Sequence, residues 1–538
     1  MFDKKAPTVL DYLNEQFKGA FDKERYFKNN IESLDYYVDM DKAYSLFDKH
    51  FNNNSDFYVL QDSDVDGVMS STIILKALCD YGIDGDKIHP LFHETSIVKP
   101  HGITDNILNE LKECNNKGLL IIPDAGSNDV EYCKELFNDG YDILILDHHN
   151  ISQNNPYAIV INNQKNKEGS KAGSGTLVTF KFIQYLAKKD FKYNIDLTDY
   201  YDLVGVSLIS DSMSFKSYEN RTFLSLLSLK HKNNEISNLV CNLHYGKGYN
   251  PLDFTFGIIP YINSVTRVGS IDDKNKITDY LVQGGNINDT TEICKLLKNC
   301  KSKQLKVCRE IQKTSKFKQL NNITICLLKE PTSLTGYLAN VLLGNCETPI
   351  IMVGQVKNKK FCGSIRAKEK VQALTCCKES GLFDLAEGHQ QAFGFIIDIS
   401  KLKDFNKVCS NLTYEKDKVV ASYDIDNEDI PEVTYCSFAN RKMDILWGND
   451  LKEPLFHIHF ICNIQDVFRQ GKTQTVLKIK HGGYEFIMFR FSKANYEKYF
   501  ANKNKFDIDI IGKLEYNTYK ENTKKQIKII SLETKQEE

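Results

Sequence analysis

The sequence predicts an α/β protein of several domains, in which a first, parallel sheet carries a metal site. Three observations support this prediction. Four short apolar runs each end in acidic or histidine side chains, strand-like and helix-like segments alternate over residues 56–235, and short strand-like segments with turns follow Val433. Buried parallel strands read as continuous Val, Ile and Leu runs, and ligands gather at their carboxyl ends. A chain of 538 residues is long enough for about two to four domains.

The four apolar runs place potential metal ligands at one edge of the predicted sheet. These side chains are Asp62, Asp64 and Asp66 after residues 57–61, Asp124 after 119–123, Asp147, His148 and His149 after 143–146, and Asp211 after 204–210. If all four runs are parallel strands, their carboxyl ends meet. We therefore expect these side chains to form one site.

The segment from Asp62 to Gly67 also matches the opening of an EF-hand calcium loop. The twelfth position of such a loop carries a bidentate Glu, whereas this chain has Ile73 there. A strand-like run precedes the segment and a helix-like run follows it. A solvated acidic turn is the other simple interpretation, and the three later motifs argue against it.

The predicted ligand set consists of carboxylates and one imidazole, without a thiolate. This set suits Mn²⁺ or Mg²⁺ rather than structural zinc. Two such ions that share a carboxylate can activate water and hold the attacking and leaving oxygens of an in-line phosphoryl displacement. The motifs therefore predict a phosphoester hydrolase with two divalent ions, Mn²⁺ or Mg²⁺.

These motifs resemble motifs I to IV of the DHH phosphoesterases, and further segments resemble the RecJ single-strand exonucleases within that superfamily. The further matches are Asn220-Arg221, residues 259–269, residues 334–343 with Pro349, Gly363-Ser-Ile-Arg366, residues 388–394, and Trp447-Gly-Asn449 with residues 453–456. The matches follow the family's order from about Asp56 to past Lys472 and so cover most of the chain. Each match alone is weak, but the ordered set is specific.

The resemblance implies a role for each candidate site residue. The implied metal ligands are Asp64, Asp66, Asp124, His148 and Asp211, with Asp124 as the bridge and Asp62 as a ligand or a close neighbour of the ions. His149 would contact the scissile phosphate, and Asp147 would lie near the ions or orient an imidazole. The implied pocket for a phosphate or terminal nucleotide consists of Ser364, Arg366, Gly388 and His389, with Asn263 and Arg267 facing the same cleft. Arg suits such a pocket because its planar fork grips two phosphate oxygens.

The chain departs from the family's pattern at four positions. Leu60 stands where some DHH subfamilies have a His ligand, and Glu387 replaces the first Gly of a Gly-Gly-His signature. His93 stands in the place of an Arg that would contact a phosphate. The segment from Ser264 to Arg267 is a looser match to Ala-Ala-Gly-Arg.

The resemblance implies a metal-dependent exonuclease that degrades single-stranded DNA from the 5′ end to mononucleotides, in DNA recombination, repair or replication. Single-stranded DNA is then the expected partner, a single-strand-binding protein or a helicase is a candidate protein partner, and a monomer is expected. A phosphodiesterase of short oligoribonucleotides or cyclic dinucleotides is an alternative, which would usually lack the connector and the C-terminal module. A catalytically inactive scaffold is a second alternative, but such a protein would be expected to have lost motif acids, whereas all four motifs are intact here.

The expected domain order follows the composition and these matches. We expect a helical segment, 1–55, packed on the first domain; a DHH domain, 56–235; a helical connector, 236–320; a smaller α/β DHH-associated domain, 321–412; an acidic linker at 427–431; and an OB-like β-barrel, 433–535. The connector is basic from Glu292 to Lys318, which predicts either a solvated face or a surface that follows a nucleic-acid backbone.

The C-terminal module interleaves aromatic and basic side chains. These are Phe468, Arg469, Lys472, Lys478, Lys480, Tyr484, Phe489 and Arg490. A groove for single-stranded nucleic acid needs both kinds, for stacking and for phosphate pairing. Alternatively, at least half of the aromatic residues belong to the core of the barrel.

Composition adds constraints on compartment. The net charge is −2, and no run of apolar residues is long enough for a transmembrane helix. The first residues have no apolar signal core, and the 15 cysteines form no CxxC pair. We therefore expect no membrane association, reduced thiols and a cytoplasmic location, which would be the host cytoplasm for a phage-encoded protein.

Overall fold

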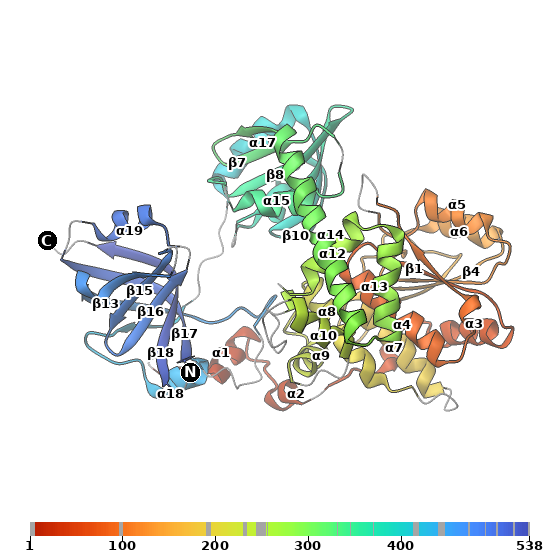
Figure 1. Cartoon of the computed structure of the whole chain (residues 1–538), viewed down its shortest axis with the longest axis horizontal. Coiled ribbons are helices and arrows are strands. Elements are labelled where there is room, and N and C mark those ends of the chain that lie inside the picture. Colours follow the sequence, from red (N-terminus) through yellow and green to blue (C-terminus); the bar gives the residue numbers. More distant parts are fainter. Residues whose placement is uncertain are drawn as a thin grey trace. The chain divides into compact units, whose positions relative to one another are not determined.

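The computed structural model divides the chain into two compact units, residues 1–29 with 416–538 and residues 30–415 (Figure 1). The structure describes residues 6–28, 30–95, 100–189, 195–229, 234–243, 254–255, 257–330, 332–344, 346–368, 371–412, 419–439, 447–471, 474–489, 491–501, 504–519 and 522–535. Within these ranges, the structure contains no helix long and apolar enough to cross a membrane.

The first sheet of the larger unit is parallel, with the strand order β2-β1-β3-β4-β5. Its strands are β1 (Phe57–Gln61), β2 (Ile88–Phe92), β3 (Leu119–Pro123), β4 (Asp142–Asp147) and β5 (Ile159–Asn162). Every residue of β1 and β3 is buried, as expected of parallel strands with both faces covered. The apolar runs at 57–61, 119–123 and 143–146 are therefore strands, as the sequence predicts.

Helices cover both faces of this sheet (Figure 1). The helices α5 (Asp105–Glu113) and α6 (Val130–Asn138) bury Ile107, Leu111 and Leu136 in one core with side chains of β1, β3 and β4. The helices α4 (Val65–Asp80) and α7 (Gly175–Lys189) pack together and contact β1 and β4. The candidate ligands follow the carboxyl ends of β1, β3 and β4.

The fourth apolar run is a helix, so its prediction as a strand was wrong. Residues 204–210 lie in α8 (Tyr201–Ser210), and Asp211 is the C-terminal cap of that helix. Val204, Val206 and Leu208 are all fully buried, so the helix is apolar on every side. Periodicity cannot distinguish such a helix from a buried strand over so short a run.

A helical connector leads from this domain to a second sheet. It consists of α9 (Tyr218–Leu229), α10 (Asn234–Leu243), α12 (Ile259–Val268), α13 (Ile271–Gln283) and the long α14 (Ile287–Thr314). The second sheet has the order β10-β11-β9-β8-β7-β6, from β6 (Lys316–Gln319), β7 (Ile323–Leu327), β8 (Ile350–Lys357), β9 (Lys360–Ala367), β10 (Phe383–His389) and β11 (Ala392–Asp398). The helix α15 (Thr335–Leu343) packs on β8 and β9, and α16 (Ala373–Ser380) and α17 (Leu402–Val408) complete this domain.

The smaller unit contains one seven-stranded sheet of order β12-β13-β17-β18-β16-β15-β14. Its strands are β12 (Val419–Asp424), β13 (Leu455–Asn463), β14 (Val467–Gln470), β15 (Val476–His481), β16 (Tyr484–Phe489), β17 (Lys505–Tyr519) and β18 (Asn522–Lys535). The helices α18 (Glu432–Ala439) and α19 (Lys493–Phe500) pack on its core. Ile425 and Ile430 are buried in that core, so the acidic segment at 427–431 is not the predicted linker and the domain begins before Val433.

The N-terminal segment does not pack as a whole on the first domain, as the sequence suggested. Helix α1 (Val9–Gln16) and α2 (Lys23–Phe27) belong to the smaller unit, where the amide of Val9 donates to Ser437 Oγ at 2.8 Å and Tyr12 packs edge-on against Phe438. The later part of the segment lies on the first domain: Glu32 accepts from the amide of Ser170, and α3 (Met40–Asn52) contacts α7 and β5. An apolar stripe predicts that a helix is covered, but not by which domain.

Candidate metal centre and phosphate pocket

The end of β1 delivers the first acidic motif. Asp64 is the N-cap of α4, and its Oδ1 accepts a hydrogen bond from the amide of Gly67 at 3.1 Å. A Cβ atom at position 67 would lie 2.6 Å from Cβ of Asp62, so only glycine fits this close turn. The turn therefore directs the carboxylates of Asp62, Asp64 and Asp66 towards the edge of the sheet.

Asp66 is fixed by the start of α7. Its carboxylate accepts from the amides of Gly175 and Thr176, both at 2.9 Å, and from Ser207 Oγ at 2.6 Å. The first amides of a helix have no partner within the helix and favour an anion. The first residues of α7 thus hold one of the motif carboxylates in place.

Asp124 follows β3 with a φ of +66°, in the left-handed region that only a few residue types adopt readily. Gly175 lies directly against it, because a Cβ at position 175 would be 2.4 Å from Asp124 Oδ1 and 2.6 Å from its Cα. The carboxyl group is fully buried, and burial together with Asp66 and Asp64 holds the pKa of Asp124 well above its usual value.

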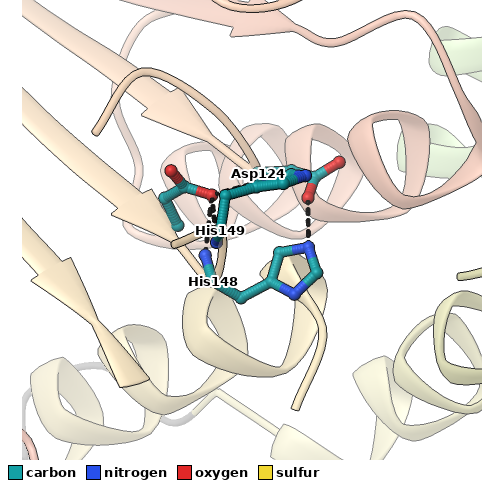
Figure 2. A group of neighbouring side chains, drawn as sticks. Asp124, His148 and His149 are labelled. Carbon is teal, nitrogen blue, oxygen red and sulfur yellow. Dashed lines mark hydrogen bonds and ion pairs between the residues drawn. The ribbon is translucent and has the colours of Figure 1, made fainter. Parts of the chain in front are cut away.

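His148 lies among three of the motif carboxylates, and Figure 2 shows its contact with one of them, Asp124. Its Nε2 is 3.3 Å from Asp124 Oδ1, 3.4 Å from Asp211 Oδ2 and 3.7 Å from Asp66 Oδ2. Nε2 of His148 and Oδ1 of Asp124 are both buried, and neither has a hydrogen-bond partner among the described residues. Burial lowers the pKa of His148, which favours the neutral imidazole that binds metals.

The ligand atoms fall into two neighbouring groups that suit two cations. One group consists of Asp66, His148 and Asp211, another of Asp62, Asp64 and Asp124, and the atoms of each lie within 4.8 Å of one another. Asp124 connects the two through its contact with His148. Several buried acids close together are expensive without a counter-ion, so these residues fit a pair of divalent ions.

Asp147 is positioned to orient the motif, and its carboxylate also lies within 4.8 Å of ligand atoms of Asp124, His148 and His149. Its Oδ1 accepts from the amides of His148 and His149 and lies 2.8 Å from His149 Nδ1, and its Oδ2 accepts from the amide of Ser127. Burial alone would raise the pKa of Asp147, but the hydrogen bond and charge of His149 lower that pKa below its usual value. Burial alone would lower the pKa of His149, but the hydrogen bond and charge of Asp147 raise that pKa to about 9.

His101 is a site residue that the sequence analysis missed. Its Nδ1 lies 3.0 Å from Asp62 Oδ2, and its ring meets the ring of His149 edge-on at 4.8 Å. The amide of Gly102 donates to Asp62 Oδ1 at 3.1 Å, so this short segment fixes Asp62. His93, in the expected place of an Arg, is buried with its Nε2 4.0 Å from Asp62.

Three of the residues expected to bind a phosphate line one cavity of about 460 Å³ in the larger unit. Arg267 comes from α12, and Ser364 and Arg366 from β9. The Nε of Arg366 donates to Asn340 Oδ1 at 2.9 Å and its Nη1 donates to the carbonyl of Ile365 at 2.8 Å, so both contacts fix the guanidinium. Burial, and then the nearby Arg267, lower the pKa of Arg366 to about 10.

A third cation, which the sequence analysis did not assign to this pocket, lies beside it. The ammonium of Lys301 in α14 is 4.6 Å from the ring centre of Tyr337, which lines the same cavity. Burial and the charge of Arg267 lower the pKa of Lys301. Within the described residues, no carboxylate forms an ion pair with Arg267, Lys301 or Arg366, so the cavity has an excess of positive charge that suits an anion.

The other predicted pocket residues are less completely placed. Asn263 does not line the cavity, although its buried Oδ1 has no hydrogen-bond partner in the described part of the chain. Gly388 adopts a φ of +137° in β10, where a Cβ would meet the backbone of Ala392. The side chain of His389 lies outside the described residues.

Comparisons with known proteins agree with these motifs. Residues 56–206 match the model of the DHH family N-terminal domain, and residues 430–531 match that of the RecJ OB domain. The chain is 31% identical over 553 aligned positions to the SPbeta prophage-derived single-strand DNA-specific exonuclease YorK of Bacillus subtilis (strain 168), with 93% of this chain and 91% of YorK covered. This chain belongs to the RecJ-like exonuclease family of DHH phosphoesterases.

Solved RecJ structures share the fold of this RecJ-like chain. RecJ from Thermus thermophilus in complex with Mn²⁺ matches with a TM-score of 0.74 at 16% identity, covering 98% of this chain and 76% of that protein. Its complex with Mg²⁺ matches with a TM-score of 0.66. At this identity the match shows the fold, including the parallel sheet, the helical connector and the C-terminal domain.

The RecJ OB domain presents part of the predicted aromatic and basic surface. Phe468 and Phe489 are 37% and 57% exposed, and the ammonium of Lys480 lies 5.5 Å from the ring centre of Phe468. Tyr484 is buried in the core, so its prediction as a binding residue was wrong. It belongs to the aromatic residues that form the core of the domain. Lys472 and Arg490 lie outside the described residues.

Proposed function

We propose that this chain is a metal-dependent exonuclease that hydrolyses single-stranded DNA from the 5′ end and releases mononucleotides. The observation that carries the proposal is the convergence of Asp66, Asp124 and Asp211 on His148 Nε2, where this nitrogen and Asp124 Oδ1 are buried without a hydrogen-bond partner among the described residues. Family membership supports the class of reaction, and the name of YorK supports single-stranded DNA as the substrate. The titles of the RecJ complexes support Mn²⁺ or Mg²⁺.

The proposed ligands are Asp64, Asp66, Asp124, His148 and Asp211, with Asp62 as a ligand or a close neighbour. Two divalent ions, when bound, would supply Lewis acidity for attack of water on the phosphodiester. The protein's own contribution is to hold the ligands before the ions arrive. The amides of α7 fix Asp66, Gly175 fixes the position of Asp124, and Asp147 fixes the backbone of His148.

His149 is proposed to contact the scissile phosphate. Its hydrogen bond with Asp147 orients the ring and favours the protonated imidazole, which can donate to a phosphate oxygen. His101 packs on the same ring, so the orientation of His149 is fixed from two sides. We expect His149 to interact with the substrate, whereas Asp147 and His101 position it.

The polarity of degradation is proposed from the resemblance to the RecJ exonucleases, and the phosphate pocket offers a place for the 5′ end. Arg267, Ser364 and Arg366 would hold the 5′-terminal phosphate, and Lys301 would add positive charge beside it. A terminal phosphate in this pocket leaves the next phosphodiester as the group to be cleaved, so single nucleotides would be released. The proposal extends to a role in DNA recombination, repair or replication in the cytoplasm, with a monomeric protein that meets a single-strand-binding protein or a helicase.

The test uses one oligonucleotide, labelled at either end and offered as single-stranded DNA, duplex DNA and RNA, with Mn²⁺, Mg²⁺ or EDTA. We expect early release of labelled mononucleotide only from 5′-labelled single-stranded DNA, and no release in EDTA. Survival of the DNA with loss of dinucleotides or short RNA would instead support the oligoribonucleotide phosphodiesterase. Binding without any hydrolysis would support an inactive scaffold.

A further inference from the structure

The C-terminal unit carries a second group of metal-ligating side chains, on two neighbouring strands. His457-Ile-His459 lies on β13 and Asp507-Ile-Asp509 lies on β17. The two strands are antiparallel, with His459 paired to Asp509 and Ile461 paired to Asp507. Directly paired residues point to the same face, so the imidazole of His459 and both carboxylates share one side of the sheet.

The burial pattern confirms which side this is. Ile458, Phe460, Ile508 and Ile510 alternate with these residues and are fully buried in the core of the unit. His459, Asp507 and Asp509 therefore lie on the opposite, outer face, where they are partly accessible. A ligand in solution can reach them without opening the core.

The contacts within the group are those of ligands around a small cation. Nδ1 of His459 is 3.4 Å from Asp507 Oδ1 and also 3.4 Å from Asp509 Oδ1, longer than an ordinary N–H···O hydrogen bond. All three ligand atoms lie within 4.8 Å of one another. Moreover, Oδ1 of Asp507 is buried and has no hydrogen-bond partner among the described residues.

A fourth residue holds one carboxylate in position. The Nε2 of His457 lies 2.9 Å from Asp509 Oδ1, so the imidazole can donate to this carboxylate. Partners of this kind fix the orientation of a metal ligand and strengthen binding. On the strands that flank the pair, β12 places Asp424 opposite His459, and β18 places Glu533 opposite Asp509 and Lys535 opposite Asp507.

We propose that His459, Asp507 and Asp509 form a second divalent-metal site, in the C-terminal domain and separate from the DHH centre. One imidazole and two carboxylates with room for water match the three-ligand sites that bind Zn²⁺, and Zn²⁺ exceeds Mn²⁺ in affinity for such mixed nitrogen and oxygen ligands. The site would cross-link β13 to β17 and stabilise this domain when the ion binds. It does not depend on the nuclease activity proposed above.

A plain imidazole–carboxylate pair is the simpler interpretation, and the same domain provides an example of one. His481 Nε2 lies 2.5 Å from Asp426 Oδ1, at hydrogen-bonding distance. His459 differs because it lies between two carboxylates and at hydrogen-bonding distance from neither. His481 is therefore a matched control for the proposed site.

The test measures Zn²⁺ binding by the full-length chain, by equilibrium dialysis without DNA, for the wild type and for His459→Gln, Asp507→Asn and His481→Gln. The DHH centre contributes the same background in every variant. We expect the wild type and His481→Gln to bind one more Zn²⁺ per chain than His459→Gln or Asp507→Asn, or to bind it at least about 10-fold more tightly. Thermal unfolding of each variant in EDTA shows that all are folded.

The two possible results are distinct. Loss of one Zn²⁺ in His459→Gln and Asp507→Asn, together with a smaller Zn²⁺-dependent rise in melting temperature, supports the site. Equal Zn²⁺ stoichiometry and affinity in the wild type and all three variants overturns it. Because no DNA is hydrolysed in this experiment, a failure of the exonuclease proposal would not change either result.

Discussion

Nε2 of His148 lies 3.3 Å from Oδ1 of Asp124, and both atoms are buried without a hydrogen-bond partner among the described residues. Such an arrangement is unfavourable in the protein alone, because buried polar atoms normally find partners. Burial and neighbouring carboxylates hold the pKa of Asp124 well above its usual value, so its ionised form is costly. A divalent cation would remove both penalties, so the site is organised for an ion before the ion binds.

The exchange Asp124→Asn separates the metal-binding role of this residue from its structural role. A carboxyl whose pKa is raised in the folded state weakens folding when it is ionised, so a neutral amide should leave the melting temperature in EDTA unchanged or higher. Hydrolysis of single-stranded DNA should fall at least about 100-fold, because a proposed metal ligand is lost. Mn²⁺ should raise the melting temperature of the wild type more than that of the variant. An equal Mn²⁺ shift in both proteins would contradict the assignment.

Gly175→Ala should disrupt the site by steric contact alone. The new Cβ would lie 2.4 Å from Asp124 Oδ1 and 2.6 Å from Asp124 Cα, and the backbone contact cannot be relieved by rotating a side chain. Overpacking of this kind costs about 1–3 kcal/mol of unfolding free energy. Gly85→Ala is the control, because a Cβ at position 85 meets nothing within 4 Å. Urea unfolding and the nuclease assay should both show a loss for Gly175→Ala and none for Gly85→Ala.

The parts of the site that could be predicted from sequence are those on the strands. Asp62, Asp124 and Asp147 come at the ends of continuous apolar runs, and parallel pairing necessarily brings such ends together. The sequence also grouped Asp211 with these residues, but as the end of a strand. In the structure Asp211 instead ends the buried helix α8. Its proximity to His148 depends on how that helix packs, which no local pattern specifies.

The residues that were missed act through tertiary contacts. His101 belongs to no motif, and only the fold brings it to Asp62 and His149. Lys301 was predicted to be part of a basic helix face, but its position beside Tyr337 depends on the packing of α14 near the second sheet. Helix α1 illustrates the same limit, because its apolar stripe is covered by α18 rather than by the first domain.

Asp147→Asn tests whether this residue orients His149. Asp147 raises the pKa of His149 to about 9, so its neutralisation should lower that pKa towards the ordinary value for histidine. NMR titration of the histidine signals in EDTA measures this shift directly. Hydrolysis should fall about 10- to 100-fold, as is usual when a residue that orients a metal-site ligand is changed. An unchanged pKa of His149 would rule out this orienting role.

His101→Ala should reduce hydrolysis while leaving the fold intact. His101 contacts Asp62 and the ring of His149, so its removal should loosen both and lower activity by about 10-fold. The control is His89→Ala, because His89 is also a partly exposed histidine that contacts a buried aspartate, Asp56, but at the start of β2. Equal activity of the two variants would remove His101 from the site.

Arg366→Lys tests the proposed recognition of a terminal phosphate. The exchange keeps the positive charge but removes the planar fork that Asn340 holds in the cavity. A lost charged hydrogen bond costs about 1.5–3 kcal/mol, so kcat/KM for 5′-phosphorylated single-stranded DNA should fall about 10- to 100-fold.

The 5′-hydroxyl form of the same oligonucleotide separates terminal recognition from a general loss of activity. Because it cannot use the phosphate contact, its kcat/KM should change much less in Arg366→Lys. Arg309→Lys makes the same exchange at an exposed position of α14 and should leave both substrates unaffected. If Arg366→Lys slows both substrates equally, then Arg366 contributes to the cavity without reading the 5′ end, and the polarity of degradation must be set elsewhere.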